Sequence, residues 1–331
     1  MKPVPKVSVI IVNYNGMPHI DGCVSSILKQ NYSNFEVIFV DNASTDGSLE
    51  YAREAFSELI FVTNDSNLGY VGGIYSGLKR ASGEYIAPIN MDTEVTPNWL
   101  SSMVKYMDVN PRVGAVNPKI LLYDDRNTLN SKGLDVHITG LGFARGLMRK
   151  DDGSVNPEKV SGVNGCSYMI RRELLERMGG APEDCFMYYD DVVISWLIKM
   201  MGYETYCIPE AVVFHKYGLA MNQTKFYYLE TYRHSLIFTS LQTRTLLLLS
   251  PIFLVIEAMI LSYALIKGWA FFRTKLRAYK TTWQNRDAIR KKKEKYASLR
   301  KLSDRSLLIG MRWNLPWEQL IRLLGYHYAR D

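Results

Sequence analysis

The chain has 331 residues, of which 47% are hydrophobic and 22% are charged. This composition is typical of a globular protein with a sizeable core and excludes a disordered or low-complexity chain. The formal net charge of +7 is concentrated between residues 273 and 305, where thirteen Lys or Arg face three acids. The basic segment therefore indicates one local anionic partner, and we expect no nucleic-acid binding because its aromatic residues are not interleaved as stacking platforms.

The cysteines are widely spaced and form no C-x-x-C pair; they are Cys23, Cys166, Cys185 and Cys207. This spacing favours buried thiols in a reducing compartment over a disulfide framework or a zinc site. The first six residues lead directly into the apolar run VSVIIV, which is too short and wrongly flanked for a signal peptide. We therefore expect the protein to work in the cytosol.

The first 120 residues alternate short apolar runs with helical stretches. Four runs, rich in β-branched and aromatic residues, are typical of strands buried on both faces of a parallel sheet: residues 7–12, 35–40, 59–63 and 84–89. Helices are predicted over residues 20–30, 47–56, 72–81 and 97–108. The last has Pro97 in its first turn and Thr96 as its N-cap. This repeated β-α-β order predicts a doubly wound α/β sheet.

A polar cluster follows each of the four predicted strands, at residues 13–16, 41–48, 64–69 and 90–94. Ligands of doubly wound sheets bind at the carboxyl ends of the strands, so the clusters predict a ligand crevice. Ordinary loop polarity remains the alternative for any single cluster.

Residues 112–220 are more irregular, with strand-like stretches at 162–171 and 205–214 around a helix over 191–201. From residue 245 to 272, only Glu257 and Lys267 interrupt an apolar stretch, and the basic segment follows it.

The crevice lacks the glycine-rich fingerprints of dinucleotide and P-loop sites, so carboxylates and amides must hold a nucleotide. Asp41 is positioned to accept hydrogen bonds from a base or a ribose. Asp92 is positioned to hold a divalent cation between diphosphate oxygens, and Mg²⁺ or Mn²⁺ suits that ligand set.

Six segments, taken in order, resemble the signatures of family 2 glycosyltransferases: VSVIIVNYNG, VDNASTDGS, NLGYVGG, INMDTEV, SGVNGCSYMIRRELLERMGG and CFMYYDDVV. The branch most resembled is the rhamnosyltransferase-like group that builds cell-surface glycans. The resemblance implies an A-type glycosyltransferase fold, in which a Rossmann-like nucleotide-binding half joins an acceptor half. We accordingly expect a nucleotide-sugar-binding half at 1–111, an acceptor and catalytic half at 112–244, and membrane-associating helices with a basic tail at 245–331.

The resemblance also implies the donor site. Asp41 should contact the base or ribose of the donor, with Asn15 and Asn67 nearby. Asn90 and Asp92 stand where the family's metal-binding D-x-D motif falls, so metal binding should depend mainly on Asp92.

An inverting transfer needs a carboxylate that accepts the acceptor's proton. By the resemblance that base is Asp191, and Asp190 tunes it or touches the acceptor. Acids are also common in a first helical turn, which is the ordinary alternative. Relatives often carry a further aspartate where this chain has Val193, and a weak or inactive membrane-attached scaffold therefore stays open.

Two further residues are candidates. In similar enzymes a histidine at the place of His215 joins the metal shell, although a lone histidine at a strand end is more often structural. Arg233 falls where relatives place an arginine, and it either pairs with diphosphate oxygens or is an ordinary surface charge.

The sequence thus predicts an inverting, metal-dependent glycosyltransferase that uses a nucleotide-sugar donor and a lipid-linked or cell-surface glycan acceptor. A sugar-1-phosphate nucleotidyltransferase is disfavoured, because no Gly-rich loop with a basic residue follows the first strand. The sugar, the base, the linkage and the oligomeric state are not revealed.

The apolar stretch is long enough to span a bilayer. A single span would place the basic tail and the catalytic half on opposite sides, whereas both are expected on the cytoplasmic side. A helix lying in the interface, with basic residues against anionic headgroups, is therefore favoured over a membrane-inserted C-terminal helix. A solvated basic helix and a buried dimer contact remain alternatives.

Overall fold

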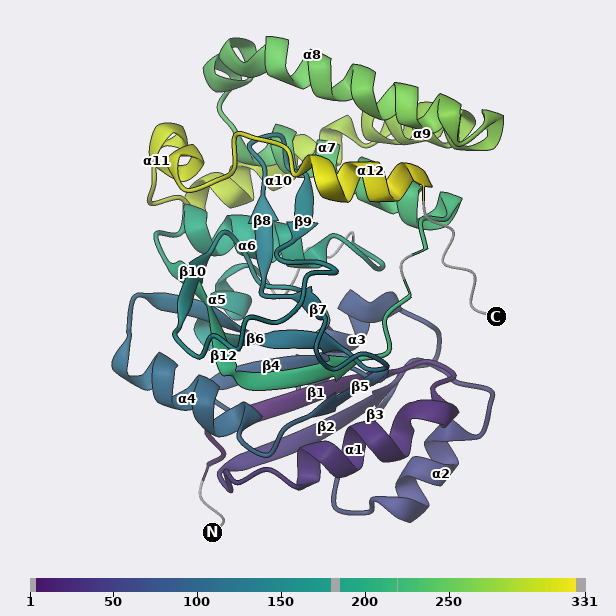
Figure 1. Cartoon of the computed structure of the whole chain (residues 1–331), viewed down its shortest axis with the longest axis vertical. Coiled ribbons are helices and arrows are strands. Elements are labelled where there is room, and N and C mark those ends of the chain that lie inside the picture. Colours follow the sequence, from purple (N-terminus) through teal and green to yellow (C-terminus); the bar gives the residue numbers. More distant parts are fainter. Residues whose placement is uncertain (1–3, 180–184, 219, 326–331) are drawn as a thin grey trace. The chain divides into compact units, whose positions relative to one another are not determined.

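The computed structural model describes residues 4–179, 185–218 and 220–325, with side chains to residue 322. The chain divides into two compact units, and Figure 1 colours it along the sequence. Unit 1 comprises residues 1–134, 144–198 and 203–217; unit 2 comprises residues 135–143, 199–202 and 218–331.

Among the described residues of unit 1, ten strands form one mixed sheet. One half of the sheet is parallel, in the order β4-β1-β2-β3. Its strands are β1 (Val7–Asn13), β2 (Phe35–Asp41), β3 (Ile60–Thr63) and β4 (Tyr85–Asn90). Their near-continuous apolar sequence fits strands covered on both faces.

The other half of the sheet continues from β4 in the order β11-β6-β12-β10, with β7 beside β6 and β5 beside β12. β12 runs parallel to β6, whereas β11 is antiparallel to both of its neighbours. The strands are β5 (Thr93–Val95), β6 (Val113–Leu122), β7 (Leu129–Ser131), β10 (Glu158–Val160), β11 (Met169–Arg171) and β12 (Glu204–His215).

Helices cover both faces of this sheet (Figure 1). They are the short η1 (Met17–His19), α1 (Ile20–Leu28), α2 (Ser48–Ala55), α3 (Gly69–Leu78), α4 (Trp99–Val109), α5 (Arg172–Arg177) and α6 (Asp190–Met200). Val9 and Ile11 share a core with α1 and α4. Ile10 points to the opposite face, where Gly77 of α3 lets the helix backbone approach β1 closely.

The predicted α/β fold class and the four N-terminal strands are confirmed. The predicted N-cap at Thr96 is wrong, because α4 begins at Trp99 with Asn98 in the cap position and Thr96 bonds Val212 instead. The predicted strand over 162–171 is wrong except at its end, where β11 forms. The predicted helix over 72–81 begins earlier, at Gly69, where a positive φ of 74° starts the first turn.

Unit 2 is mostly helical. Its helices are α7 (Gln223–Ser240), α8 (Thr243–Ile266), α9 (Trp269–Gln284), α10 (Arg286–Leu299), α11 (Asp304–Ile309) and α12 (Trp317–Gly325). A small hairpin of β8 (Leu134–Val136) and β9 (Gly142–Ala144) lies at its sequence boundary with unit 1. The apolar stretch that the sequence marked at 245–272 is divided by Gly268, whose φ of 106° separates α8 from α9.

All four cysteines are free and buried, as their spacing predicts. The predicted boundaries near residues 111 and 244 remain predictions.

Candidate active site

The ends of β1 and β2 are joined by hydrogen bonds between their polar clusters. The Asn13 amide donates to Asp41 Oδ1 over 2.8 Å, and the Ser44 backbone N–H donates to Asp41 Oδ2 over 3.0 Å. Asn15 has a positive φ of 54° and accepts from the Thr45 N–H through its side chain over 2.8 Å. Since parallel strands end at the same edge of a sheet, two of the predicted clusters form one surface.

Asparagines extend this hydrogen-bonded edge to β3 and α3. The Asn42 amide donates to the Gly69 carbonyl over 2.8 Å, and its own oxygen accepts from Asn64 over 2.8 Å. Asn67 accepts from the Gly69 N–H over 2.8 Å and so fixes the first turn of α3. The donor-binding roles predicted for Asn15, Asp41 and Asn67 remain predictions, but all three lie along this edge.

Asp92 and His215 are brought together by the pairing of β5 with β12. This pairing sets His215 opposite Thr93, and the Lys216 N–H donates to the Asp92 carbonyl over 3.0 Å. The Asp92 Oδ1 and His215 Nε2 atoms lie 3.4 Å apart. Burial alone would raise the pKa of Asp92, but the hydrogen bond and charge of His215, a backbone hydrogen bond and the charge of His19 together lower that pKa.

Asn130 orients the His215 ring. Its side-chain oxygen lies 2.9 Å from His215 Nδ1, and because this oxygen only accepts, Nδ1 carries the proton. Nε2 then donates to the Asp92 carboxylate only when the ring is charged, and in the neutral ring the Nε2 lone pair is available to a cation beside Asp92. Two ligand atoms 3.4 Å apart fit the bite of one divalent cation with metal–ligand distances of about 2.1 Å. The predicted metal-binding pair is therefore geometrically competent.

The Asp191 carboxylate is held by two backbone N–H groups. Gly165 donates to Oδ2 over 3.0 Å and Val192 donates to Oδ1 over 2.8 Å. The Asp191 carbonyl in turn accepts from Ser195 Oγ over 2.6 Å. These bonds fix the direction of the carboxylate, whose oxygens are acceptors when it is ionised.

Asp190 lies beside this carboxylate but is buried. Burial, and then the charge of Asp191, raises the pKa of Asp190 to about 7. Its Oδ2 atom and the Tyr168 hydroxyl have no hydrogen-bond partner in the part of the chain that the structure describes. Tyr188 and Tyr189, just before this pair, both have positive φ values, of 63° and 65°. Two adjacent strained residues are a frequent mark of a functional site.

The Asp92 and Asp191 regions meet at one loop, residues 164–166. The Gly165 N–H holds Asp191, and the Cys166 carbonyl accepts from the Asn90 N–H over 2.9 Å. Tyr70 of α3 donates its hydroxyl to the Gly165 carbonyl over 3.1 Å. Burial raises the pKa of Tyr70 well above its usual range, and the nearby charges of Asp190 and Asp92 contribute to that rise. Asp92, just after β4, and the acidic pair of α6 therefore share the environment of this loop.

Three residues of this arrangement were not singled out from the sequence: Tyr70, Asn130 and Gly165. Tyr70 and Gly165 do fall inside the NLGYVGG and SGVNGCSYM segments. Val193 is buried in α6.

Arg233 is placed differently from the other candidates. It lies in unit 2, only 1% exposed, and its guanidinium donates to the carboxylates of Glu230 and Glu257. The ordinary surface-charge alternative is therefore wrong, because the side chain is buried and paired. Its predicted contact with a diphosphate remains a prediction.

Comparisons with known proteins bear on this site. The sequence model described as Glycosyl transferase family 2 matches residues 8–179. An uncharacterized glycosyltransferase of Haemophilus influenzae is 34% identical over 119 residues, which are 35% of this chain and 37% of that protein. The poly-beta-1,6-N-acetyl-D-glucosamine synthase of Staphylococcus epidermidis is 25% identical over 212 residues, 62% of this chain and 48% of that protein. The O-antigen biosynthesis protein RfbC of Myxococcus xanthus is 28% identical over 223 residues, 64% of this chain and 17% of that protein. The chain thus spans less than half the length of these relatives.

Solved structures share the fold. The mannosyltransferase PcManGT of Pyrobaculum calidifontis, in complex with GDP-Man and Mn²⁺, superposes with a TM-score of 0.53 at 21% identity, covering 98% of this chain and 82% of that one. GalNAc-T7 with UDP, GalNAc and Mn²⁺ gives a TM-score of 0.57 at 17% identity, covering 72% and 51%. These likenesses confirm the predicted A-type glycosyltransferase fold.

Proposed function

The chain belongs to glycosyl transferase family 2, and from this premise we propose that it transfers a sugar, with inversion, from a nucleotide-sugar donor to an acceptor hydroxyl. The observation that carries the proposal is the loop of residues 164–166, whose backbone bonds both the Asp191 carboxylate and the end of β4 that precedes Asp92. A transfer reaction needs these two carboxylate positions within reach of one substrate.

The donor nucleotide is proposed to bind at the edge formed by the ends of β1, β2 and β3. Asp41 would accept hydrogen bonds from the base or ribose, and Asn15 and Asn67 would line the same edge. Their existing bonds within the chain support this role, because they fix each side chain before the donor arrives.

A divalent cation, Mg²⁺ or Mn²⁺, would be held by Asp92 and His215, with Asn90 beside them. Bound there, it would offset the negative charge that develops on the departing diphosphate. The proposal is supported by the facing Asp92 Oδ1 and His215 Nε2 atoms. It is also supported by Asn130, which fixes the ring orientation as the outer partners of histidine ligands usually do.

Asp191 is proposed to accept the proton of the acceptor hydroxyl. The hydroxyl oxygen then forms a bond to the anomeric carbon of the donor, the bond from that carbon to the diphosphate oxygen breaks, and the nucleoside diphosphate leaves with the electron pair. A single displacement of this kind inverts the anomeric configuration. Backbone bonds from Gly165 and Val192 keep the Asp191 carboxylate oriented without neutralising it.

Asp190 is proposed to contact the acceptor. Its Oδ2 is buried and unpartnered among the described residues, so a substrate hydroxyl would satisfy it. The raised pKa also leaves Asp190 partly protonated near neutral pH, so it can also donate a hydrogen bond to an acceptor oxygen.

The proposed acceptor is a lipid-linked or cell-surface glycan. The names of two relatives, a poly-N-acetylglucosamine synthase and an O-antigen biosynthesis protein, support this class. The donor sugar and the nucleotide are left open, and one screen would identify them.

The test is release of nucleoside diphosphate by the purified chain from UDP-, GDP- and dTDP-sugars with Mn²⁺ or Mg²⁺. We expect one donor to give turnover that chelation abolishes. Binding of a nucleotide sugar without any turnover would instead support the scaffold that Val193 leaves open, and release without a cation would remove the proposed metal role.

A further inference from the structure

One face of α8 is exposed and almost entirely apolar. At 100° per residue, the exposed residues of α8 from Leu247 onward fall within an arc of about 120°. They are Leu247, Leu248, Pro251, Leu254, Val255, Ala258, Ser262, Leu265 and Ile266. We call this set the α8 stripe. Leu248 is 79% exposed and Leu254 is 70% exposed, so large side chains project fully into the surroundings.

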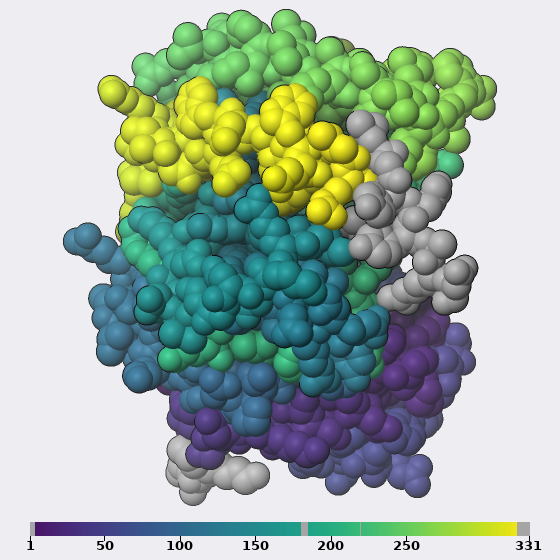
Figure 2. Space-filling model, viewed as in Figure 1, coloured from purple at the N-terminus to yellow at the C-terminus, as the bar shows by residue number. Residues whose placement is uncertain are grey.

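The opposite face of α8 packs against other helices of unit 2. Leu249, Ile256 and Ala264 are buried there, and α8 contacts α9. Figure 2 shows the residues of α8, in green, on the molecular surface along the length of the helix. A helix of a soluble protein normally exposes a polar face, whereas the exposed face of α8 is apolar, as its buried face is. Contiguous exposed apolar surface of this kind marks an interaction site.

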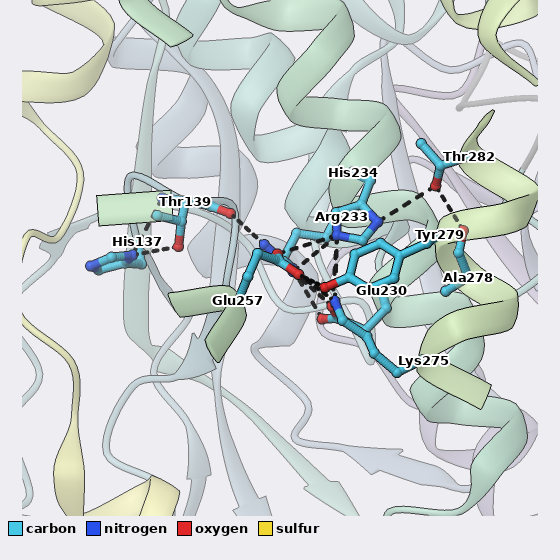
Figure 3. A network of polar contacts seen from close by, with 10 residues as sticks. All are labelled: His137, Thr139, Glu230, Arg233, His234, Glu257, Lys275, Ala278, Tyr279 and Thr282. Carbon is cyan, nitrogen blue, oxygen red and sulfur yellow. Dashed lines mark hydrogen bonds and ion pairs between the residues drawn. The ribbon is translucent and has the colours of Figure 1, made fainter. Parts of the chain in front are cut away.

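Glu257 fastens the middle of α8 to its neighbours. Its carboxylate accepts from Arg233 of α7 and from Tyr279 of α9, and it lies 2.7 Å from Lys275 Nζ. Glu230 of α7 completes the cluster with bonds to Arg233 and Lys275. Figure 3 shows these side chains converging from the three helices.

This cluster is a clamp and not a metal site. Glu230, His234 and Glu257 have the donor types and spacing of a metal triad. Arg233 and Lys275, both almost fully buried, already neutralise the two carboxylates. Burial alone would raise the pKa of Glu230, but the two cations outweigh it and lower that pKa to about 2. Two fixed cations between the ligands leave no room for a third.

The clamp bears on how α8 can meet a membrane. Among the described residues α8 is the single helix long and apolar enough to cross a bilayer, and only 11% of its most apolar window is buried. Spanning would require α8 to leave α7 and α9. That step would strip Arg233 and Lys275 of a buried partner and carry Glu257 into hydrocarbon, both of which are strongly unfavourable. A helix lying flat keeps the clamp intact.

Charged and aromatic residues of α9 and α10 indicate what kind of partner covers the α8 stripe. Trp269 and Trp283, at the two ends of α9, are exposed, and each has a guanidinium against its ring, from Arg273 and Arg286. Indoles with adjacent cations are typical of the headgroup layer of a membrane. The exposed cations of α9 and α10 far outnumber the acids; they are Arg273, Arg277, Lys280, Arg286, Arg290, Lys291 and Lys295. This complement matches an anionic lipid surface.

We propose that α8 lies in the plane of an anionic lipid bilayer, with the α8 stripe immersed and the Glu230–Arg233–Glu257–Lys275 clamp preventing it from spanning. The proposal does not depend on the transfer chemistry, because it rests on unit 2 alone.

The first test is co-flotation of the purified full chain with vesicles. Vesicles of 30% phosphatidylglycerol in phosphatidylcholine should bind the chain at least about tenfold better than pure phosphatidylcholine. Leu248→Glu with Leu254→Glu should lower binding to the anionic vesicles about tenfold or more. Val109→Glu is the matched control, because Val109 is 73% exposed on α4 of unit 1 and its variant should bind normally.

The second test separates the flat orientation from a span. The native cysteines are buried, so a single introduced cysteine at an exposed position can be labelled selectively. The two variants are Thr243→Cys, at the N-terminal end of α8, and Ala270→Cys, just beyond its C-terminal end. With the chain bound to sealed vesicles, an impermeant maleimide added outside should label both positions. Labelling of one position only would overturn the proposal in favour of a spanning helix.

Two further results would also overturn it. One is absence of binding by the wild-type chain to anionic vesicles. The other is a dimer in sedimentation that the Leu248→Glu, Leu254→Glu variant dissociates, because the stripe would then be covered by a second copy. A circular-dichroism melt of the variant checks that its fold is intact, and the two cysteine positions test the proposal without altering the stripe.

Discussion

Gly69 is the position where the donor edge meets the loop that presents the acidic pair. Its φ is 74°, and an added Cβ would overlap the carbonyl oxygen of Phe186 and come within 2.7 Å of the Phe186 ring. Substituting Gly69→Ala therefore imposes two separate penalties. The left-handed conformation disfavours alanine by about 1 kcal/mol, and the overlap with backbone adds about 1–3 kcal/mol, because backbone must move.

Gly153 provides a matched control for this substitution. Its φ is 70°, and nothing lies within 4 Å of the position where its Cβ would be. Gly153→Ala should therefore destabilise the protein by the conformational penalty alone, about 1 kcal/mol. Urea unfolding of both variants, followed by circular dichroism, gives the comparison. We expect Gly69→Ala to lose about 2 kcal/mol more than Gly153→Ala.

The same substitution should affect catalysis. Phe186 lies four residues before Asp190, so relieving the overlap displaces the loop that leads into the acidic pair. At a temperature where the variant is folded, kcat should fall by at least about tenfold, because small misplacements of a catalytic group are costly. Equal destabilisation of the two variants, with normal kcat in Gly69→Ala, would refute the close packing of α3 against this loop.

Two further predictions concern charge and metal binding. The pKa of Asp190 is raised from 3.8 to about 7 by burial, so the native state is penalised increasingly as the pH rises from 4 to 7. Asp190→Asn should therefore stabilise the protein at pH 8 by at most about 4 kcal/mol. Urea unfolding should show that this gain in stability vanishes near pH 4. An equal effect at both pH values would contradict the prediction. Asn130→Ala should weaken Mn²⁺-dependent binding of nucleoside diphosphate about 10–100-fold by calorimetry, because His215 loses its orienting partner, whereas unchanged affinity would remove His215 from the metal site.

The donor edge could be predicted from the sequence because it depends on local order. Each buried strand is followed at once by polar residues, and parallel strands bring their ends to one edge. The 2.8 Å bond between Asn13 and Asp41, 28 residues apart, is the direct result. The same reasoning placed Asp92 at the end of β4.

The rest of the site depends on pairings that no local pattern encodes. His215 reaches Asp92 only because β12 pairs with β5, and Asn130 reaches His215 from the short strand β7, 85 residues earlier in the chain. In the sequence, Tyr70 looks like an ordinary helix residue. Its role becomes visible only in the structure, where its hydroxyl bonds the loop around Gly165. These contacts are set by tertiary packing, so periodicity and composition could not reveal them.

Unit 2 gives a second example. In the sequence, Glu257 is a charge inside an apolar stretch, and it makes a membrane-spanning helix unfavourable. The structure gives the reason for this acid, since Arg233 and Lys275 from neighbouring helices meet it. A helical pattern predicts which residues share a face, but it does not tell which buried charge will face that acid.

The central claim is that Asp92 and Asp191 serve one site in different roles, and paired measurements on Asp191→Asn and Asp92→Ala test it most directly. Transfer and Mn²⁺-dependent affinity for nucleoside diphosphate would be measured on each purified variant. The account predicts that Asp191→Asn loses at least about 10²-fold in transfer with its affinity unchanged, whereas Asp92→Ala loses both. Near-normal transfer by Asp191→Asn, or unaltered metal-dependent affinity in Asp92→Ala, would contradict it.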